Sequence, residues 1–166
     1  MRVKGVVRDI DLGFKKARSE ILGRDALGGA GRRFPAELTI GVFGDLDENA
    51  PQKARYAEFG TRTAPRRPFL STTFDRSRRE AYLAFARAFG ASLLKRGVSA
   101  RREGLEAAGR FMGRRLQESI ESWSSPPNAA STVRKKGFNN PLIETGSMLR
   151  SVGYRIGDAG KPRRDF

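Results

Sequence analysis

The sequence predicts a single α+β domain, in which a small mixed or antiparallel sheet packs with two to three helices. Three observations support this fold class. Residues 37–43 and 151–157 alternate apolar and polar side chains, as half-buried strands do. Two longer stretches, residues 72–96 and 100–122, carry apolar residues at helical spacing. The chain has 166 residues, the length of one domain, so we expect one unit over 1–160 and a mobile basic tail at 161–166.

The first third of the chain predicts a strand, a helix and a second strand. Val3–Val7 has the composition of a short strand, and Asp11–Leu27 has apolar residues at helical spacing. The glycine-rich residues 28–31 are predicted to end that helix. Residues 37–43 follow as a strand with one apolar face, and the polar, proline-containing residues 44–53 are predicted to form a loop.

An extended arm is predicted over residues 60–70. Pro65 and Pro68 fix their own φ angles and push the preceding residues toward extended geometry, and Gly60 permits a sharp bend into the arm. The arm carries three arginines and ends in two apolar residues: Arg62, Arg66, Arg67, Phe69 and Leu70. Two roles remain open for the apolar tip. It can anchor in a neighbour's pocket at low entropic cost, or it can pack on the protein's own helices.

Two helices are predicted after the arm. In the first, Thr72 can cap the helix with Asp75 three residues on, and an apolar stripe runs through Phe74, Ala81, Phe85, Phe89 and Leu93. Gly97 is predicted to end this helix, and Ser99 to cap the next one.

The second helix has the clearest periodicity in the chain, with a stripe formed by Leu105, Gly109, Met112, Leu116, Ile120 and Trp123. It also contains Gly104 and Gly113, and each interior glycine costs about 1 kcal/mol relative to alanine. Either another backbone approaches these glycines closely, or the helix is a locally weak surface helix.

A long loop is predicted over residues 124–141, because Pro126 and Pro127 break the second helix. The loop carries a basic cluster of Arg134, Lys135 and Lys136, and loops of this length are commonly functional or disordered. Residues Ser147–Ile156 then form a turn and a strand.

Composition excludes several kinds of chemistry. The sequence has no cysteine and no histidine, which excludes Cys/His metal sites, disulfides and catalytic triads with a histidine base. We therefore expect no catalytic residue, no metal and no cofactor. No apolar run approaches the roughly 18 residues of a membrane span, so we expect a soluble protein without membrane contact.

The positive charge is concentrated in the middle of the chain. The net charge is +15, and residues 61–115 alone hold 14 basic and 4 acidic residues, a net charge of +10. Such a segment predicts an acidic partner, either a nucleic acid or an acidic protein surface. Among the basic residues on the two helices, Arg110, Arg114 and Arg115 are candidate interface residues.

Two sequence blocks resemble a known family. The first, Ala57-Glu58-Phe59-Gly60 followed by Pro65-Arg66-Arg67-Pro68-Phe69-Leu70, resembles the "EFG…PxRPF" pattern of tailed-bacteriophage morphogenesis proteins. The second holds Thr132 to Gly137 and then Pro141 to Ser151, and it resembles their "T-x-x-x-K-G…PLI-x-TG" ending. The matching positions are Glu58, Phe59, Gly60, Pro65, Arg67, Pro68, Phe69, Pro141, Leu142, Thr145 and Gly146. One position departs from the pattern, because Ala64 stands where members commonly have Ile.

The resemblance implies a non-enzymatic structural virion protein of the phage neck or tail-completion region, made in the host bacterial cytoplasm. Such proteins join the head connector to the tail as a ring, here expected to hold six or twelve copies. Its partners would be neighbouring head-connector, head-closure and tail proteins, with non-specific contact to packaged DNA. The implied interface comprises Arg62, Arg66, Arg67, Phe69, Leu70, Arg110, Arg114, Arg115, Arg134, Lys135 and Lys136.

Three alternatives remain open. The chain can be another ring component of the same particle, such as a tail terminator. It can be a non-specific nucleic-acid-binding protein, whose affinity would fall steeply with salt. An enzyme that works with carboxylates alone is the remaining alternative, and Glu58 would be its candidate residue.

Overall fold

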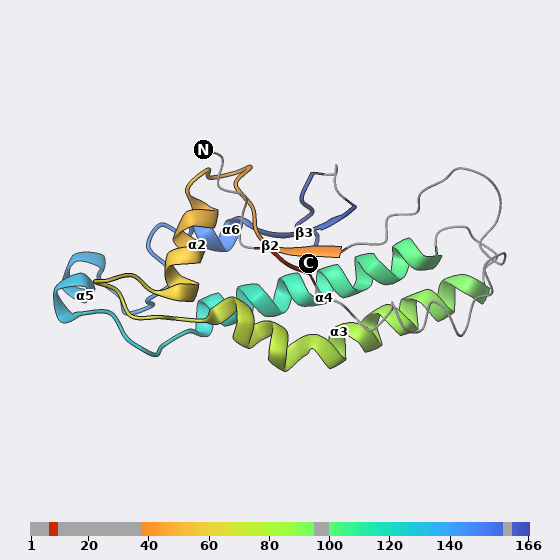
Figure 1. Cartoon of the computed structure of the whole chain (residues 1–166), viewed down its shortest axis with the longest axis horizontal. Helices are drawn as coiled ribbons and strands as arrows, with labels where there is room; N and C mark the ends of the chain where they lie inside the picture. Colours follow the sequence, from red (N-terminus) through yellow and green to blue (C-terminus); the bar gives the residue numbers. More distant parts are fainter. Residues whose placement is uncertain (1–6, 10–37, 95–99, 158–160) are drawn as a thin grey trace.

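The computed structural model describes residues 7–9, 38–94, 100–157 and 161–166, and it has an α+β fold (Figure 1). A three-stranded antiparallel sheet contains β1 (Val7–Asp9), β2 (Leu38–Val42) and β3 (Val152–Ile156), with β2 in the centre. The helices are α2 (Ala50–Phe59), α3 (Phe69–Leu94), α4 (Ala100–Ser122), α5 (Ala130–Lys136) and α6 (Ser147–Arg150). The predicted α+β class is confirmed. The helix predicted over Asp11–Leu27 lies outside the described residues, and so do Gly97 and Ser99.

The sheet has one strongly apolar face because the strand register aligns the alternating apolar residues. Ile40 pairs with Tyr154 and Val42 with Val152, and all four side chains are almost completely buried. Strand β2 is buried along its whole length, as expected for the central strand of a sheet. The predicted strands at 37–43 and 151–157 are therefore confirmed.

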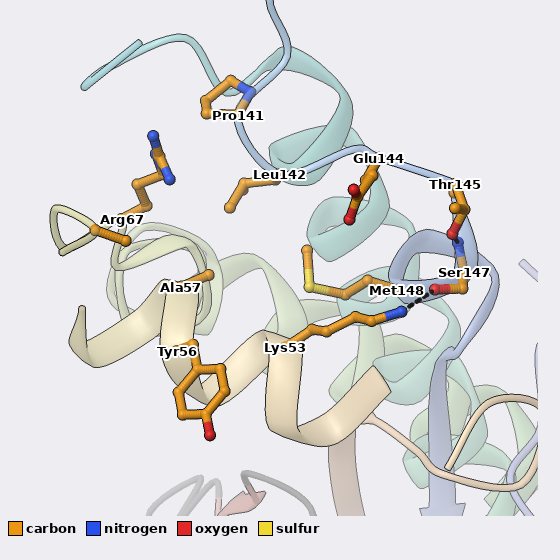
Figure 2. Close-up of a pocket in the computed structure, with 12 residues that line it drawn as sticks. Lys53, Tyr56, Ala57, Arg67, Pro141, Leu142, Glu144, Thr145, Ser147 and Met148 are labelled. Carbon is orange, nitrogen blue, oxygen red and sulfur yellow. Dashed lines mark hydrogen bonds between the residues drawn. The ribbon is translucent and has the colours of Figure 1, made fainter. Parts of the chain in front are cut away.

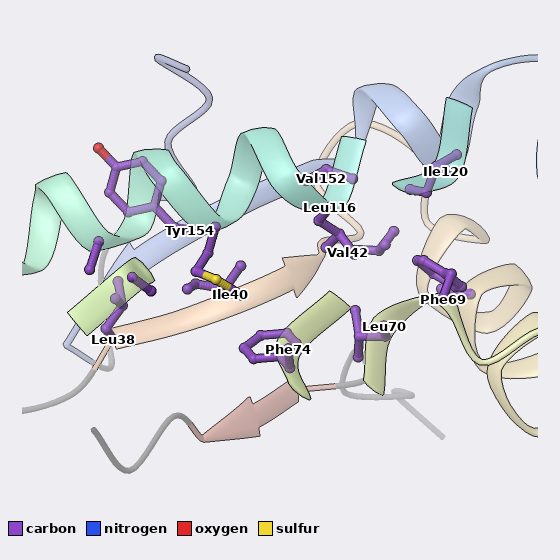
Figure 3. Close-up of a cluster of buried hydrophobic side chains, with 14 of the residues drawn as sticks. Leu38, Ile40, Val42, Phe69, Leu70, Phe74, Leu116, Ile120, Val152 and Tyr154 are labelled. Carbon is purple, nitrogen blue, oxygen red and sulfur yellow. The ribbon is translucent and has the colours of Figure 1, made fainter. Parts of the chain in front are cut away.

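Helix α4 packs against β2 and β3, and α3 runs along α4 (Figure 1). The core lies where the sheet, α3 and α4 meet. Phe69, Leu70 and Phe74 from the first turns of α3 lie beside the strands (Figure 3). Leu116 and Ile120 close the core from the α4 side. The helix hairpin thus supplies most of the large apolar side chains that cover the sheet.

The predicted start of the first long helix is wrong by one turn, because α3 begins at Phe69. Thr72 therefore lies inside the helix and does not cap it. The predicted stripe is buried at Phe74, Ala81 and Phe85, but Leu93 near the end of α3 is 56% exposed. The second helix has the predicted bounds of 100–122.

The three glycines of α4 make room for aromatic side chains. A Cβ at Gly104 would lie 2.7 Å from the Phe85 ring, and one at Gly113 would lie 2.5 Å from the Phe166 ring. At Gly109 the added carbon would collide with the ring of Tyr154. The sequence predicts that another backbone approaches these glycines. In the structure, most of the atoms nearest to them belong to aromatic rings.

Residues 161–166, which the sequence predicts to be a mobile basic tail, contact the sheet in the structure. The backbone of Arg163 forms two hydrogen bonds with Tyr154, of 2.8 and 3.0 Å, and so extends the edge of the sheet. The Tyr154 hydroxyl donates to Asp165 at 2.8 Å, and Arg164 pairs with Asp45. This C-terminal segment is held because its charged residues meet partners on β3, on α4 and on the loop after β2.

Candidate functional site

The site is built around α2, a helix that the sequence analysis placed partly in a loop. Pro51 lies in the first turn, where the missing N–H of proline costs nothing, and Gly60 follows the last residue. Gly60 has φ of 75° and its N–H donates to the Tyr56 carbonyl, which ends the helix. Proline just inside the start and glycine just past the end could have identified α2. Pro51 itself and the acidic residues before α2 favoured a loop instead.

Glu58 caps the N-terminus of α3. Its carboxylate accepts the backbone N–H of Leu70 at 2.9 Å and that of Ser71 at 3.1 Å, and also the Ser71 hydroxyl. The side chain is 3% exposed, and a negative charge at this position is stabilised by the helix dipole. This cap explains why α3 begins at Phe69. It gives Glu58 a structural role that needs no enzymatic function.

The predicted arm extends toward α5, and its second half returns to contact α2 (Figure 1). The Arg67 N–H donates to the Ala57 carbonyl at 2.7 Å, and Arg66 Nε donates to the Glu58 carbonyl at 3.1 Å. Phe69 and Leu70 are 0% and 2% exposed. The hypothesis that these two side chains anchor in a neighbour is therefore wrong, because they are part of the protein's own core.

Arg67 joins the first sequence block to the segment after α4. Its Nε donates to the Pro126 carbonyl at 3.0 Å, and Nη2 donates to the Pro127 carbonyl at 3.2 Å. Burial lowers the pKa of the Arg67 guanidinium below its ordinary value. Arg67 thus forms structural hydrogen bonds within the protein and is not a freely exposed interface residue.

Asn140 organises the second block. Its side-chain amide donates to the carbonyls of Ile120 and Glu121, at 3.0 and 2.7 Å, and so caps the C-terminal end of α4. Its side-chain oxygen accepts the N–H groups of Leu142 and Ile143, at 2.8 and 2.9 Å. The role of Asn140 is not predictable from the sequence, because an asparagine before a proline carries no signal of it on its own.

The predicted long loop at 124–141 is interrupted by α5, which ends at the left-handed Gly137. Lys136, at the end of α5, donates to the carbonyl of Asn140 at 2.8 Å and to that of Ile143. Burial lowers the pKa of Lys136, while the nearby Glu144 carboxylate acts in the opposite direction. Lys136 therefore holds the second block together, and only Arg134 and Lys135 of the basic cluster are exposed.

The two blocks enclose a groove of about 230 Å³, which we call the α2 groove (Figure 2). It is lined by α2, the returning arm and residues 141–148, and it holds Lys53, Tyr56, Ala57, Ala64, Arg67, Pro141, Leu142, Glu144, Thr145, Gly146, Ser147 and Met148. Lys53 Nζ lies 3.2 Å from both Asp47 Oδ2 and Ser147 Oγ. The hydrogen bond from Ser147 and the charge of Lys53 hold the pKa of Asp47 below its ordinary value.

The elements α2, the arm and α5 with the residues just after it lie at one end of the molecule and carry exposed aromatic and basic residues (Figure 1). Tyr56, Phe59 and Phe138 are 48%, 64% and 41% exposed. Apart from Lys53, which pairs with Asp47, the exposed basic residues on the same elements are Arg55, Arg62, Arg66, Arg134 and Lys135. We call these eight residues the basic end. Aromatic residues and arginines are enriched in protein interfaces.

The α4 arginines are separate from the α2 groove. Arg110 pairs with Asp165 at 3.2 Å, and Arg115 pairs with Glu118 at 3.0 Å. Arg114 is exposed. Local carboxylates therefore offset part of the charge that the sequence assigns to this region.

Within the described part of the chain, no acidic cluster suits a metal ion, and no helix is both long and apolar enough to cross a membrane. Comparison with known proteins found no matching family model, curated protein or solved structure.

Proposed function

We propose that the chain is a structural protein of the phage neck or tail-completion region, which joins the head connector to the tail as part of a ring. One observation carries the proposal. The two sequence blocks that resemble this family are far apart in the chain, yet they fold against each other around the α2 groove. The bonds from Arg67 to the carbonyls of Pro126 and Pro127 attach the first block to the segment that leads into the second.

The basic end supports a role in assembly. Its aromatic residues are open to solvent on elements that are fixed to the core by Glu58, Arg67 and Asn140. A rigid surface loses little conformational entropy on docking, so its contacts contribute more fully to affinity. In this proposal the neighbouring head-connector, head-closure or tail proteins present acidic surfaces to the basic end.

The test is quantitative mass spectrometry of nuclease-treated, purified virions, with this chain counted against the portal protein. We expect about six or twelve copies per particle, because ring assemblies close with a fixed number of subunits. A different position in the particle, mapped by crosslinking, would favour a tail terminator. Absence from intact particles would overturn the structural proposal.

A non-specific nucleic-acid-binding protein is the second candidate, and the net charge of +15 favours it. This candidate predicts binding to DNA of any sequence with an affinity that falls steeply with salt. It also predicts no fixed copy number in virions, which separates it from the first proposal.

A further inference from the structure

A second groove lies between the first half of α3 and the last half of α4, and has a volume of about 500 Å³. We call it the α3–α4 groove. Seven of its eleven lining residues are serine or threonine, and they come from α3, from α4 and from the residues just after α4. The matching positions of the two sequence blocks do not line it, so the proposed function leaves this groove unexplained.

The wall of the groove carries a hydrogen-bond donor without a partner. Trp123 Nε1 is buried and has no acceptor among the described residues. Ser77, on the α3 wall, is 9% exposed. Buried donors in folded proteins nearly always have an acceptor, so the unpaired indole N–H points to a missing acceptor atom.

The charges in the groove favour an anion. Arg76 lies on the α3 wall and Arg115 on the α4 wall, and the carboxylate of Glu118 is the one negative group in the lining. Arg115 is paired with Glu118 at 3.0 Å and lies over the Phe111 ring, 5.4 Å from its centre. The groove therefore keeps a net positive charge, with one guanidinium on each side.

A ligand for this groove needs negative charge and several acceptor oxygens. Arginine forks, hydroxyls and the indole N–H all donate, and phosphate oxygens accept from such donors. The other exposed arginines of the two helices, Arg78, Arg79, Arg87, Arg102 and Arg114, provide further positive charge along the same hairpin. A chain of phosphates would use this extended charge, whereas a single free phosphate would use only the groove.

We propose that the α3–α4 groove binds a phosphate of a nucleic-acid backbone. Arg76 and Arg115 contact its oxygens from the two walls, and Trp123 donates its indole N–H. The contact is independent of sequence, because phosphate contacts carry no base information. This inference goes beyond the neck proposal and gives the second candidate, nucleic-acid binding, a specific site. It stands whether or not the chain belongs to a phage neck.

The protein contains a built-in reporter, because Trp123 is its only tryptophan. We would titrate the full chain with a mixed-sequence DNA duplex and follow tryptophan fluorescence at several salt concentrations. Saturable binding with a change in Trp123 emission is expected. The magnitude of the slope of log K against log salt should fall by about 1 in the double variant Arg76→Gln with Arg115→Gln, because the two arginines contact the same phosphate.

The matched control is Arg78→Gln with Arg114→Gln. It removes the same charge from the same helices, at exposed positions that do not line the groove. The control should keep most of the slope and the full change in emission. Equal weakening by both double variants would overturn the proposal, since binding would then depend on overall charge alone.

Trp123→Phe tests the indole N–H directly, because it keeps an aromatic ring in place. Binding is then followed by the anisotropy of a labelled duplex, and we expect affinity to fall roughly 5- to 10-fold. Unchanged affinity would contradict the assigned contact, provided circular dichroism shows a folded variant.

Inorganic phosphate separates the two sources of the ligand. Millimolar phosphate could change the Trp123 emission of the parent but not of Arg76→Gln with Arg115→Gln. That result, combined with no binding of the duplex, would identify a free-phosphate site and overturn the nucleic-acid assignment. These experiments use the isolated chain. Their failure would leave the virion stoichiometry, and with it the proposed function, untouched.

Discussion

Single residues of the first sequence block act mainly inside the protein. Glu58 is a buried carboxylate whose charge is matched by the N-terminus of α3 and by the Ser71 hydroxyl. Arg67 is bound to carbonyls of the chain after α4. Sequence reasoning assigned the arginine to an interface because exposed arginines are common and its acceptors lie far away in the chain.

Replacement of Glu58 tests this structural role. Glu58→Ala leaves the N–H groups of Leu70 and Ser71 without their acceptor, so we expect the free energy of unfolding to fall by about 1–3 kcal/mol. Urea denaturation measures the loss. Glu80→Ala, at an exposed position of α3, is the control and should change stability by less than about 0.5 kcal/mol. Equal effects of the two substitutions would show that Glu58 does not cap the helix.

Glycines of the two long helices predict opposite effects of the same substitution. Gly109→Ala adds a carbon that collides with the Tyr154 ring, so we expect a net loss of about 1–3 kcal/mol in unfolding free energy. A Cβ at Gly90 on α3 meets no atom within 4 Å. Gly90→Ala should therefore stabilise the protein by about 0.5–1 kcal/mol through helix propensity. Thermal and urea unfolding of both variants would decide, and stabilisation by Gly109→Ala would contradict the packing described.

At the scale of elements, the C-terminal segment is the main difference between expectation and structure. Residues 161–166 look like a tail because they are polar and end the described sequence. In the fold, Phe166 covers Gly113 and Arg163 pairs with Glu106. The segment thus links β3 to α4, and its order depends on partners that no local pattern reveals.

Low pH should weaken the contacts that hold residues 161–166. The hydrogen bond and charge of Arg164 lower the pKa of Asp45. Although burial alone would raise the pKa of Asp165, hydrogen bonds from Tyr154 and Arg110 leave it below its ordinary value. A carboxyl group with a lowered pKa in the folded state stabilises the protein at neutral pH, and this contribution is lost as pH falls through that pKa. We therefore expect the unfolding free energy to decrease below about pH 4.

The double variant Asp45→Asn with Asp165→Asn provides the comparison. It should be less stable than the parent at pH 7, and the difference should shrink between about pH 4 and pH 2 because the parent carboxylates become protonated. Urea titrations at each pH measure this. A constant difference across the range would mean that neither carboxylate ionisation stabilises the segment.

At the scale of the whole molecule, charge is distributed unevenly among surfaces. The basic end combines exposed aromatics with arginines that form no ion pair with another described residue, while Arg110 and Arg115 on α4 are paired with carboxylates. The two surfaces therefore have different proposed partners, a protein at the basic end and a phosphate in the α3–α4 groove.

Disruption of the basic end should impair assembly and leave the fold intact. Phe59→Ala with Arg62→Ala changes exposed side chains, so we expect unfolding free energy to stay within about 0.5 kcal/mol. Incorporation into virions, measured against the portal, should fall several-fold. Leu93→Ala, at the opposite end of α3 and also exposed, should incorporate normally. Normal incorporation of the double variant would exclude the basic end as an assembly surface.

Local patterns in the sequence were sufficient for the α+β class, the strands at 37–43 and 151–157, and the bounds of α4, because periodic burial depends on spacing within one element. Local patterns also identified the residues of both blocks, although the sequence could not show that the two blocks contact each other. Only the tertiary structure decided that Phe69 and Leu70 are core residues, that Arg67 and Lys136 bind carbonyls, and that residues 161–166 are held in place. Each of these outcomes depends on a partner distant in the chain, and spacing along a sequence carries no information about such partners.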